Sequence, residues 1–148
     1  MPFTENYGRL LMALSRQETA AIVAIDGNPY TVNPLDASFI LVAKLGLGTD
    51  GSQFFPTQTE LIAKLTDDVV TESAITVSDS EVFQNVSIAY SDVASHVIKE
   101  SAVYALCNDV GATLRQIMIR RDLLTPPFTT NPSTSYTNNY KQSQSLLI

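Results

Sequence analysis

Cysteine, histidine and tryptophan are almost absent from this sequence. Its 148 residues contain one Cys, one His and no Trp. A single cysteine cannot form an intrachain disulfide, so the sequence gives no sign of an oxidising compartment. Cys107 follows the apolar residues 103–106, where we expect a small, buried thiol.

Positive charge is also scarce, which bears on the class of partner. Nine Lys and Arg face fifteen Asp and Glu, for a net charge of −6 and a pI near 4.5. Binding to a phosphate backbone needs clustered cations, so we expect no nucleic-acid partner. The nearest approach to a cluster is Arg115, Arg120 and Arg121 with Asp122 beside them, which we interpret as solvated charges at strand ends.

Long apolar runs are missing as well. None approaches the roughly 18 residues that a membrane span requires, and the N-terminus lacks the basic region and apolar run of a secretory signal. We therefore expect a soluble protein made in a cytoplasm, without a membrane partner. Only 16% of residues are charged while 45% are hydrophobic. A sparsely charged surface rich in small polar residues suits a subunit of a larger assembly, although ordinary β domains share it.

Three of the six glycines fall in one short stretch, residues 46–51. Its Gly-x-Gly-x-x-Gly pattern matches a dinucleotide-binding loop, which requires a helix starting at the third glycine within a βαβ unit. Residues 52–56 separate Gly51 from any helical residue, so we expect no cofactor. We predict instead that Gly46, Gly48 and Thr49 shape a loop. Thr57 and Glu60 have the spacing of a capping box for a short helix.

The remaining pattern predicts one helix followed mainly by antiparallel strands. A helix is expected over residues 4–17, capped by Thr4 or Asn6, with Leu10, Leu11 and Leu14 on one face. Residues 20–25 could prolong that helix or form a strand, and a turn follows at residues 26–29. Strands are expected over residues 38–45, 69–77, 82–90, 96–106 and 113–121, the last four joined in pairs by polar turns. The class is therefore α+β, mainly antiparallel β and sandwich-like, in a single domain over residues 1–124.

Residues 125–148 differ in character from the rest. They are rich in Pro, Ser, Thr and Asn and cannot build a core of their own. A disordered tail is one interpretation. The other is an extended arm that becomes ordered on a neighbour, which the apolar end favours. The arm's contact residues would be Phe128, Tyr136, Tyr140, Leu146, Leu147 and Ile148.

The sequence contains no recognisable catalytic or metal-binding pattern. His96 is the only histidine, no Ser lies in a Gly-x-Ser-x-Gly elbow, and Cys107 is too isolated to suggest a Cys–His pair. The acidic residues near strand ends are explained by solvation, and residues 79–81 lack the ligands of a calcium loop. We expect no enzyme and no catalytic or metal residue, while a metal shared between subunits stays open. The acidic residues in question are Asp67, Asp68, Asp79 and Glu81.

The order of elements carries a family resemblance. An apolar strand precedes Gly46-Leu47-Gly48-Thr49, then comes Pro56-x-x-Thr59-x-Leu61, then Ile98-Lys99-Glu100, and finally Gly111 with Leu114 to Arg120. Over residues 8–124 this resembles the N-terminal attachment domains of bacteriophage tail-fibre, tail-collar and baseplate proteins. The family places Gly-Leu-Phe where this chain has Ala102-Val103-Tyr104, and its loop before the proline is shorter.

The resemblance implies a mechanical role in a virion assembled in the bacterial cytoplasm. Such a subunit would form homo-oligomers, often trimers, and join other structural proteins of a tail, neck or baseplate. Residues 126–148 would grip a neighbour. The alternative is a β module that binds carbohydrate or another ligand, with Tyr90, Tyr104, Tyr136 and Tyr140 stacking on sugars. An enzyme with an unrecognised site is the third class.

Overall fold

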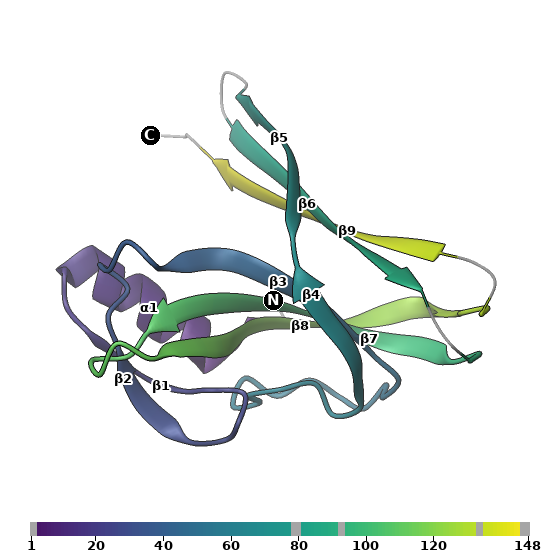
Figure 1. Cartoon of the computed structure of the whole chain (residues 1–148), viewed down its shortest axis with the longest axis horizontal. Coiled ribbons are helices and arrows are strands. Elements are labelled where there is room, and N and C mark those ends of the chain that lie inside the picture. Colours follow the sequence, from purple (N-terminus) through teal and green to yellow (C-terminus); the bar gives the residue numbers. More distant parts are fainter. Residues whose placement is uncertain (1–2, 78–80, 92–93, 133–134, 146–148) are drawn as a thin grey trace.

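A four-stranded antiparallel sheet is the centre of the chain in the computed structural model (Figure 1). The structure describes the backbone of residues 3–77, 81–91, 94–132 and 135–145, and the side chains of residues 3–70, 87–91 and 94–132. The central sheet has the order β4-β3-β7-β8, β1 and β2 form a hairpin, and the third sheet has the order β5-β6-β9. The elements are α1 (Glu5–Arg16), β1 (Ala20–Val23), β2 (Pro29–Val32), β3 (Ile40–Gly48), β4 (Lys64–Val69), β5 (Thr71–Val77), β6 (Glu81–Ser91), β7 (Val97–Asn108), β8 (Leu114–Thr129) and β9 (Ser135–Ser145).

The predicted class, mainly antiparallel β with a short N-terminal helix, is confirmed. Thr4 is the N-cap of α1 because its hydroxyl accepts from the backbone N–H of Tyr7 at 3.3 Å. The same hydroxyl donates to the carbonyl of Met118 at 2.8 Å, so one buried side chain also joins the helix to β8. Leu10 is buried as predicted, whereas Leu11 is exposed.

The ambiguous run after the helix is a strand, β1. Asn6, the other candidate cap, has a different role. Its side-chain amide donates to the carbonyl of Val23 at 2.8 Å, and its Oδ1 accepts from the Val23 N–H at 3.1 Å. Asn6 thus takes the place of a neighbouring strand at the outer edge of β1. The predicted turn at residues 26–29 closes the β1–β2 hairpin, with Gly27 at a φ of 81°.

One face of the central sheet carries the main core. Helix α1 packs against β1 and β8, and the hairpin extends this cover. Cys107 is fully buried here as a free thiol, as predicted, and burial raises its pKa to about 11. The buried residues of this core are Leu10, Ala13, Ala20, Ile22, Ala24, Val32, Val42, Leu45, Ile88, Val103, Ala105, Cys107, Ile117 and Ile119.

The predicted pairing of the later strands is confirmed, and β8 is longer than expected. Strands β5 and β6 pair antiparallel, as do β7 and β8 around the predicted turn at residues 108–111. Strand β8 continues past Arg121 because Phe128 and Thr129 pair with Ile98 and Val97 at the start of β7. The boundary predicted after residue 124 therefore falls inside β8.

Much of the predicted arm is a strand of this chain's own third sheet. Strand β9 pairs with β6 along its length, with Tyr136 opposite Tyr90 and Tyr140 opposite Val86. In Figure 1, β5, β6 and β9 diverge from the central sheet, while Ile88 at the near end of β6 lies in the main core. Phe128 is half-buried in β8. Leu146, Leu147 and Ile148 lie outside the described residues.

The helix predicted after Thr57 is wrong. Residues 56–63 are turns and irregular backbone, and the exposed Thr57 caps nothing. The Glu60 carboxylate cannot close a capping box because it accepts from the hydroxyl of Tyr104 and pairs with Lys64. The hydrogen bond from Tyr104, 44 positions away in the sequence, thus takes the place of the capping contact with Thr57 that the spacing suggested.

Two threonines, Thr4 and Thr57, test this assignment of caps. Thr4→Ala should lower the free energy of unfolding by about 1–2 kcal/mol, since it removes a helix cap and a buried hydrogen bond. Thr57→Ala should change it by less than about 0.5 kcal/mol, because Thr57 is exposed in a turn. Urea unfolding followed by circular dichroism measures both. Equal losses at the two positions would contradict the assignment.

Candidate functional site

Residues 49–63 connect β3 to β4 and cross the face of the central sheet opposite α1; we name them the strap. Only Leu61 of the strap is a buried apolar residue, and it packs on Ala102, Tyr104 and Met118. Most of the strap's other side chains are exposed or half-buried. Apolar burial is therefore a small part of what holds the strap.

A buried ion pair beneath the strap supplies the larger part. Glu100 of β7 and Arg121 of β8 are both 0% exposed, and the Arg121 Nε donates to the Glu100 Oε1 at 2.9 Å. The Glu100 carboxylate also accepts from three backbone N–H groups of the strap. These belong to Asp50 at 3.1 Å, Ile62 at 3.1 Å and Ala63 at 2.9 Å. Both ends of the strap are thus bound to one carboxylate.

Arg121 also binds the strap, at residues 50, 52 and 58. Its Nη1 donates to the carbonyl of Ser52 at 2.9 Å and reaches the Oε1 of Gln58 at 3.5 Å. Its Nη2 donates to the carbonyl of Asp50 at 3.2 Å. A buried guanidinium is tolerated only where its charge is balanced and its N–H groups have acceptors, and here each nitrogen has one. The interpretation of Arg121 as a solvated strand-end charge is wrong.

The glycines of the dinucleotide-like stretch are explained by these neighbours. Gly46 and Gly48 lie within β3, not in the predicted loop, and Gly48 pairs with Glu100. A Cβ on Gly48 would lie 2.5 Å from the Glu100 Oε2 and 2.7 Å from the carbonyl oxygen of Ala63. A Cβ on Gly46 would lie 2.8 Å from the ring of Tyr104. Glycine is required here to make room for side chains of β7.

A second polar network borders the ion pair. The Tyr104 hydroxyl donates to the Glu60 Oε1, and Lys64 lies 2.9 Å from the Glu60 Oε2 and 2.8 Å from the Asp67 Oδ2. Burial, and then the charge of Glu60, raises the pKa of Tyr104 far above its usual value. Burial tends to raise the pKa of Asp67, but hydrogen bonds from Lys64 and Gln116 outweigh it, and the net pKa is lowered. At neutral pH the network holds a neutral phenol among paired charges.

Thr49, a predicted loop residue, and two residues not predicted as site residues, His96 and Arg115, have partners within the fold. Thr49 does follow β3, and its N–H donates to the Ala63 carbonyl at 3.0 Å, closing the base of the strap. The backbone N–H of His96 donates to the hydroxyl of Thr130 at 2.9 Å. Arg115 pairs with Asp109 at 2.9 Å, and its guanidinium lies 3.7 Å from the ring centre of Tyr30.

The Glu100–Arg121 pair was missed by the sequence interpretation. The sequence carries no signal that singles them out, because each has charged neighbours: Lys99 precedes Glu100, and Arg120 and Asp122 flank Arg121. The sequence also does not show that Glu100 and Arg121 come together beneath a strap whose bonded residues lie 37–71 positions away along the chain. Among the residues that the structure describes, no three His, Cys, Asp or Glu side chains are grouped so that they could hold a metal ion.

Comparisons with known proteins leave the family open. No protein-family model, curated protein or solved structure matches this chain. Among the described residues, no helix combines the length and apolarity that crossing a bilayer would take.

Glu100→Gln tests whether the ion pair dominates the anchoring of the strap. The substitution leaves the buried Arg121 with only the partly exposed carboxylate of Asp50, 3.9 Å away, as a counter-ion. The free energy of unfolding should therefore fall by about 3 kcal/mol. Glu18→Gln is the control: Glu18 pairs with Arg16 at 3.9 Å, both side chains are more than half exposed, and the loss should stay below about 1 kcal/mol. Chemical denaturation at pH 7 measures both. A loss below about 1 kcal/mol for Glu100→Gln would contradict the anchoring role.

Three Gly→Ala substitutions test the packing around β3. Gly48→Ala should destabilise the chain by about 1–3 kcal/mol, because the new methyl overlaps the Glu100 carboxylate and the Ala63 carbonyl. Gly51→Ala meets only the flexible side chain of Lys99, at 3.3 Å, and should be nearly neutral. Gly8→Ala, within α1 and with open space around it, should stabilise by about 0.5–1 kcal/mol. Thermal and urea unfolding give the order of stability of the three variants. A Gly48→Ala protein as stable as the wild type would contradict the explanation that Glu100 and Ala63 require glycine at position 48.

Proposed function

We propose that this protein is a non-enzymatic structural subunit of a bacteriophage virion. It forms homo-oligomers and joins neighbouring components of a tail, neck or baseplate. The order of sequence motifs supports this, as does a polar site whose hydrogen bonds go to the chain's own backbone. Glu100 and Arg121 hold the strap, and their carboxylate oxygens and guanidinium nitrogens are already engaged. Such an arrangement shapes a surface and carries out no bond chemistry.

The third sheet is the single observation that carries the proposal furthest. Strands β5 and β9 are the two edges of a three-stranded sheet that diverges from the rest of the chain (Figure 1). The described helix, α1, packs instead against β1 and β8. A sheet of this size gains stability when another surface covers it, and its edges offer backbone groups to a further strand. A neighbouring subunit would supply both.

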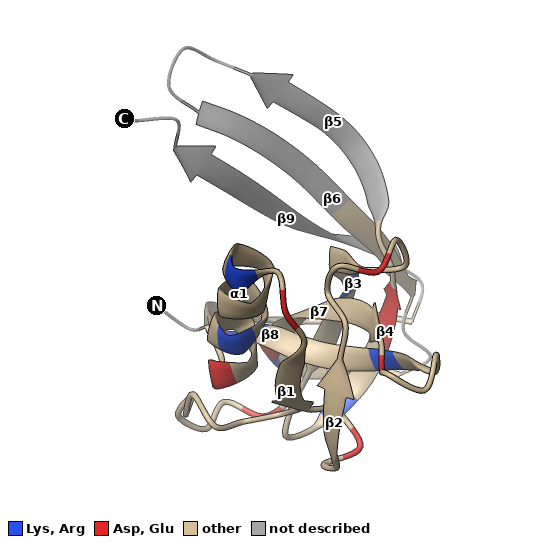
Figure 2. Cartoon of the chain, turned by 90° about the vertical axis from the view of Figure 1, so that its left-hand side faces the viewer, with Lys and Arg blue, Asp and Glu red and all other residues tan. Residues whose placement is uncertain are grey.

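The distribution of charge agrees with a protein partner. Figure 2 shows Lys and Arg interspersed with Asp and Glu over the described elements, where a nucleic-acid site would gather cations on one face. The exposed ion pairs, such as Arg9–Glu5 and Arg16–Glu18, are local and of mixed sign. Weak, shape-specific contacts between protein subunits do not require a strong electrostatic field of one sign.

The alternative of a carbohydrate-binding module loses one of its four aromatic candidates. Tyr104 is 0% exposed and its hydroxyl is bound to Glu60, so its ring cannot stack on a sugar. Tyr90 is half-buried, and the side chains of Tyr136 and Tyr140 lie outside the described set. No described residue favours this function over assembly.

The aromatic residues of β9 provide the test. Tyr136 and Tyr140 both belong to β9, where they pair with Tyr90 and Val86 of β6. Replacing both with Ser should weaken self-association and abolish incorporation into particles, because aromatic residues are enriched among those that dominate the energy of such contacts. Asn138→Ser, between them in the same strand, is the matched control and should leave assembly unchanged. Native mass spectrometry and circular dichroism separate lost assembly from lost folding; a doubly substituted protein that assembles normally would remove the arm from the proposal.

A further inference from the structure

Hydrogen bonds from Glu100 and Arg121 hold the strap at more points than its small buried apolar area would suggest. Burying a carboxylate and a guanidinium is costly, and a buried ion pair is weak evidence for a gain in stability. Its clear effect here is geometric, because one carboxylate and one guanidinium fix the backbone of the strap at residues 50, 52, 62 and 63. Loops held in one conformation by a rigid scaffold are typical of binding surfaces.

The tip of this strap presents an aromatic side chain to the outside. Phe55 is 53% exposed. A turn holds its backbone at both ends, since the Phe55 N–H donates to the Oε1 of Gln58 at 3.2 Å and the Gln58 N–H donates to the Phe55 carbonyl at 3.0 Å. The next residue, Pro56, accepts from the N–H of Glu5 at 2.9 Å, so the tip lies against the first turn of α1. A pre-positioned aromatic side chain loses little entropy on binding.

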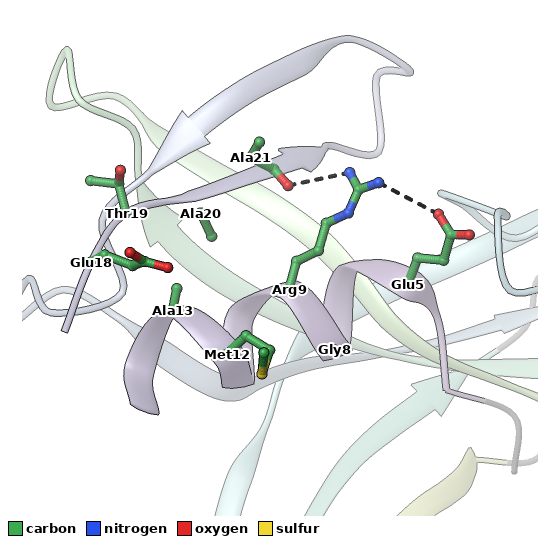
Figure 3. A pocket seen from close by; sticks show the side chains of 9 residues that line it. All are labelled: Glu5, Gly8, Arg9, Met12, Ala13, Glu18, Thr19, Ala20 and Ala21. Atoms are coloured by element: carbon green, nitrogen blue, oxygen red, sulfur yellow. Dashed lines mark hydrogen bonds and ion pairs between the residues drawn. The ribbon is translucent and has the colours of Figure 1, made fainter. Parts of the chain in front are cut away.

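An apolar groove begins at the same turn of the helix. It has a volume of about 510 Å³ and runs between α1 and the outer edge of β1 (Figure 3). Gly8, Ala13, Ala20 and Ala21 make its floor shallow and wide, and the half-exposed Met12 forms one side. This volume is in the range of sites that receive an aromatic group. Figure 3 shows Arg9 at one end of the groove, bound to the Ala21 carbonyl and to Glu5.

We propose that Phe55 of one copy of this chain inserts into the α1–β1 groove of a second copy, across a two-fold axis. The inference rests on the proposed homo-oligomer and names one of its interfaces. Tip and groove both adjoin Glu5, so one patch contains the inserted group and its receptor, as a self-complementary two-fold interface requires. The first copy's groove receives Phe55 of the second in the same way.

The charges beside the groove favour a second copy over an unrelated partner. Tyr7 lies midway between Glu5 and Arg9 in α1. A two-fold axis crossing the helix there makes the two helices antiparallel and places Arg9 of each copy opposite Glu5 of the other. Because Pro56, the residue after Phe55, is bound to Glu5 of its own copy, the same axis brings Phe55 over Gly8 and Met12 of the other copy. Opposite charges and apolar contacts are thus matched by one symmetry operation.

Cross-linking between two differently substituted proteins tests this contact. Phe55→Cys protein is mixed with Met12→Cys protein under mild oxidation, and disulfide-linked heterodimers should form. Phe55→Cys mixed with Val69→Cys is the control, because Val69 is 62% exposed at the end of β4, outside the groove. Cys107 is fully buried and stays in both proteins. Equal yields in the two mixtures would overturn the proposal.

Dissociation constants from sedimentation give an independent measurement. Phe55→Ala should raise the dissociation constant of the homo-oligomer at least about ten-fold while leaving the urea midpoint unchanged. Ile62→Ala, in the same strap and 50% exposed, is the matched control and should leave both unchanged.

The results separate this interface from the wider proposal. A wild-type oligomer that neither cross-links through Phe55 and Met12 nor weakens with Phe55→Ala refutes the Phe55 interface and leaves the virion subunit standing. A wild-type protein that stays monomeric at all concentrations, with no incorporation into particles, refutes both.

Discussion

The contact between Glu100 and Arg121 is the constraint on which the rest of this structure depends. It joins β7 to β8 in the interior, and its remaining donors and acceptors go to the backbone of the strap. Two opposite charges without solvent are stable only when every polar atom has a partner. The strap supplies those partners, so the ion pair and the strap conformation require each other.

This requirement extends into the strand next to the pair. Glu100 and Tyr104 point to the same side of β7, and the space they need lies over β3. Gly48 and Gly46 leave that space open. Any larger residue would displace the carboxylate or the ring, and with it the hydrogen bonds that hold residues 50–63. A pattern that resembles a phosphate-binding loop thus has its cause in packing against β7.

The two faces of the central sheet have different chemistry. Helix α1 and the β1–β2 hairpin bury a mainly apolar core on one face. The strap covers the other face with a small apolar cluster and two linked polar networks. Apolar packing tolerates exchange of similar side chains, whereas a satisfied polar network specifies one arrangement. The face beneath the strap is therefore the one that sets a defined shape at the surface, which suits a subunit whose proposed role is to fit its neighbours.

Local pattern was sufficient for most of the fold and for little of the site. Apolar spacing and Thr4 predicted α1, and alternation with polar turns predicted the β5–β6 and β7–β8 hairpins, because these depend on residues close together in sequence. Strand β2, which pairs with its sequence neighbour β1, was also not predicted, but three larger misses depend on distant partners: Glu60 bound to Tyr104, Arg121 buried against Glu100, and β9 paired with β6. By itself the sequence determined the class, the helix, the turns and the buried Cys107. Only the tertiary structure decided that Gly46 and Gly48 are strand residues and that Glu100 and Arg121 hold the strap, since burial changes what a charge can bind and spacing along the chain does not reveal burial.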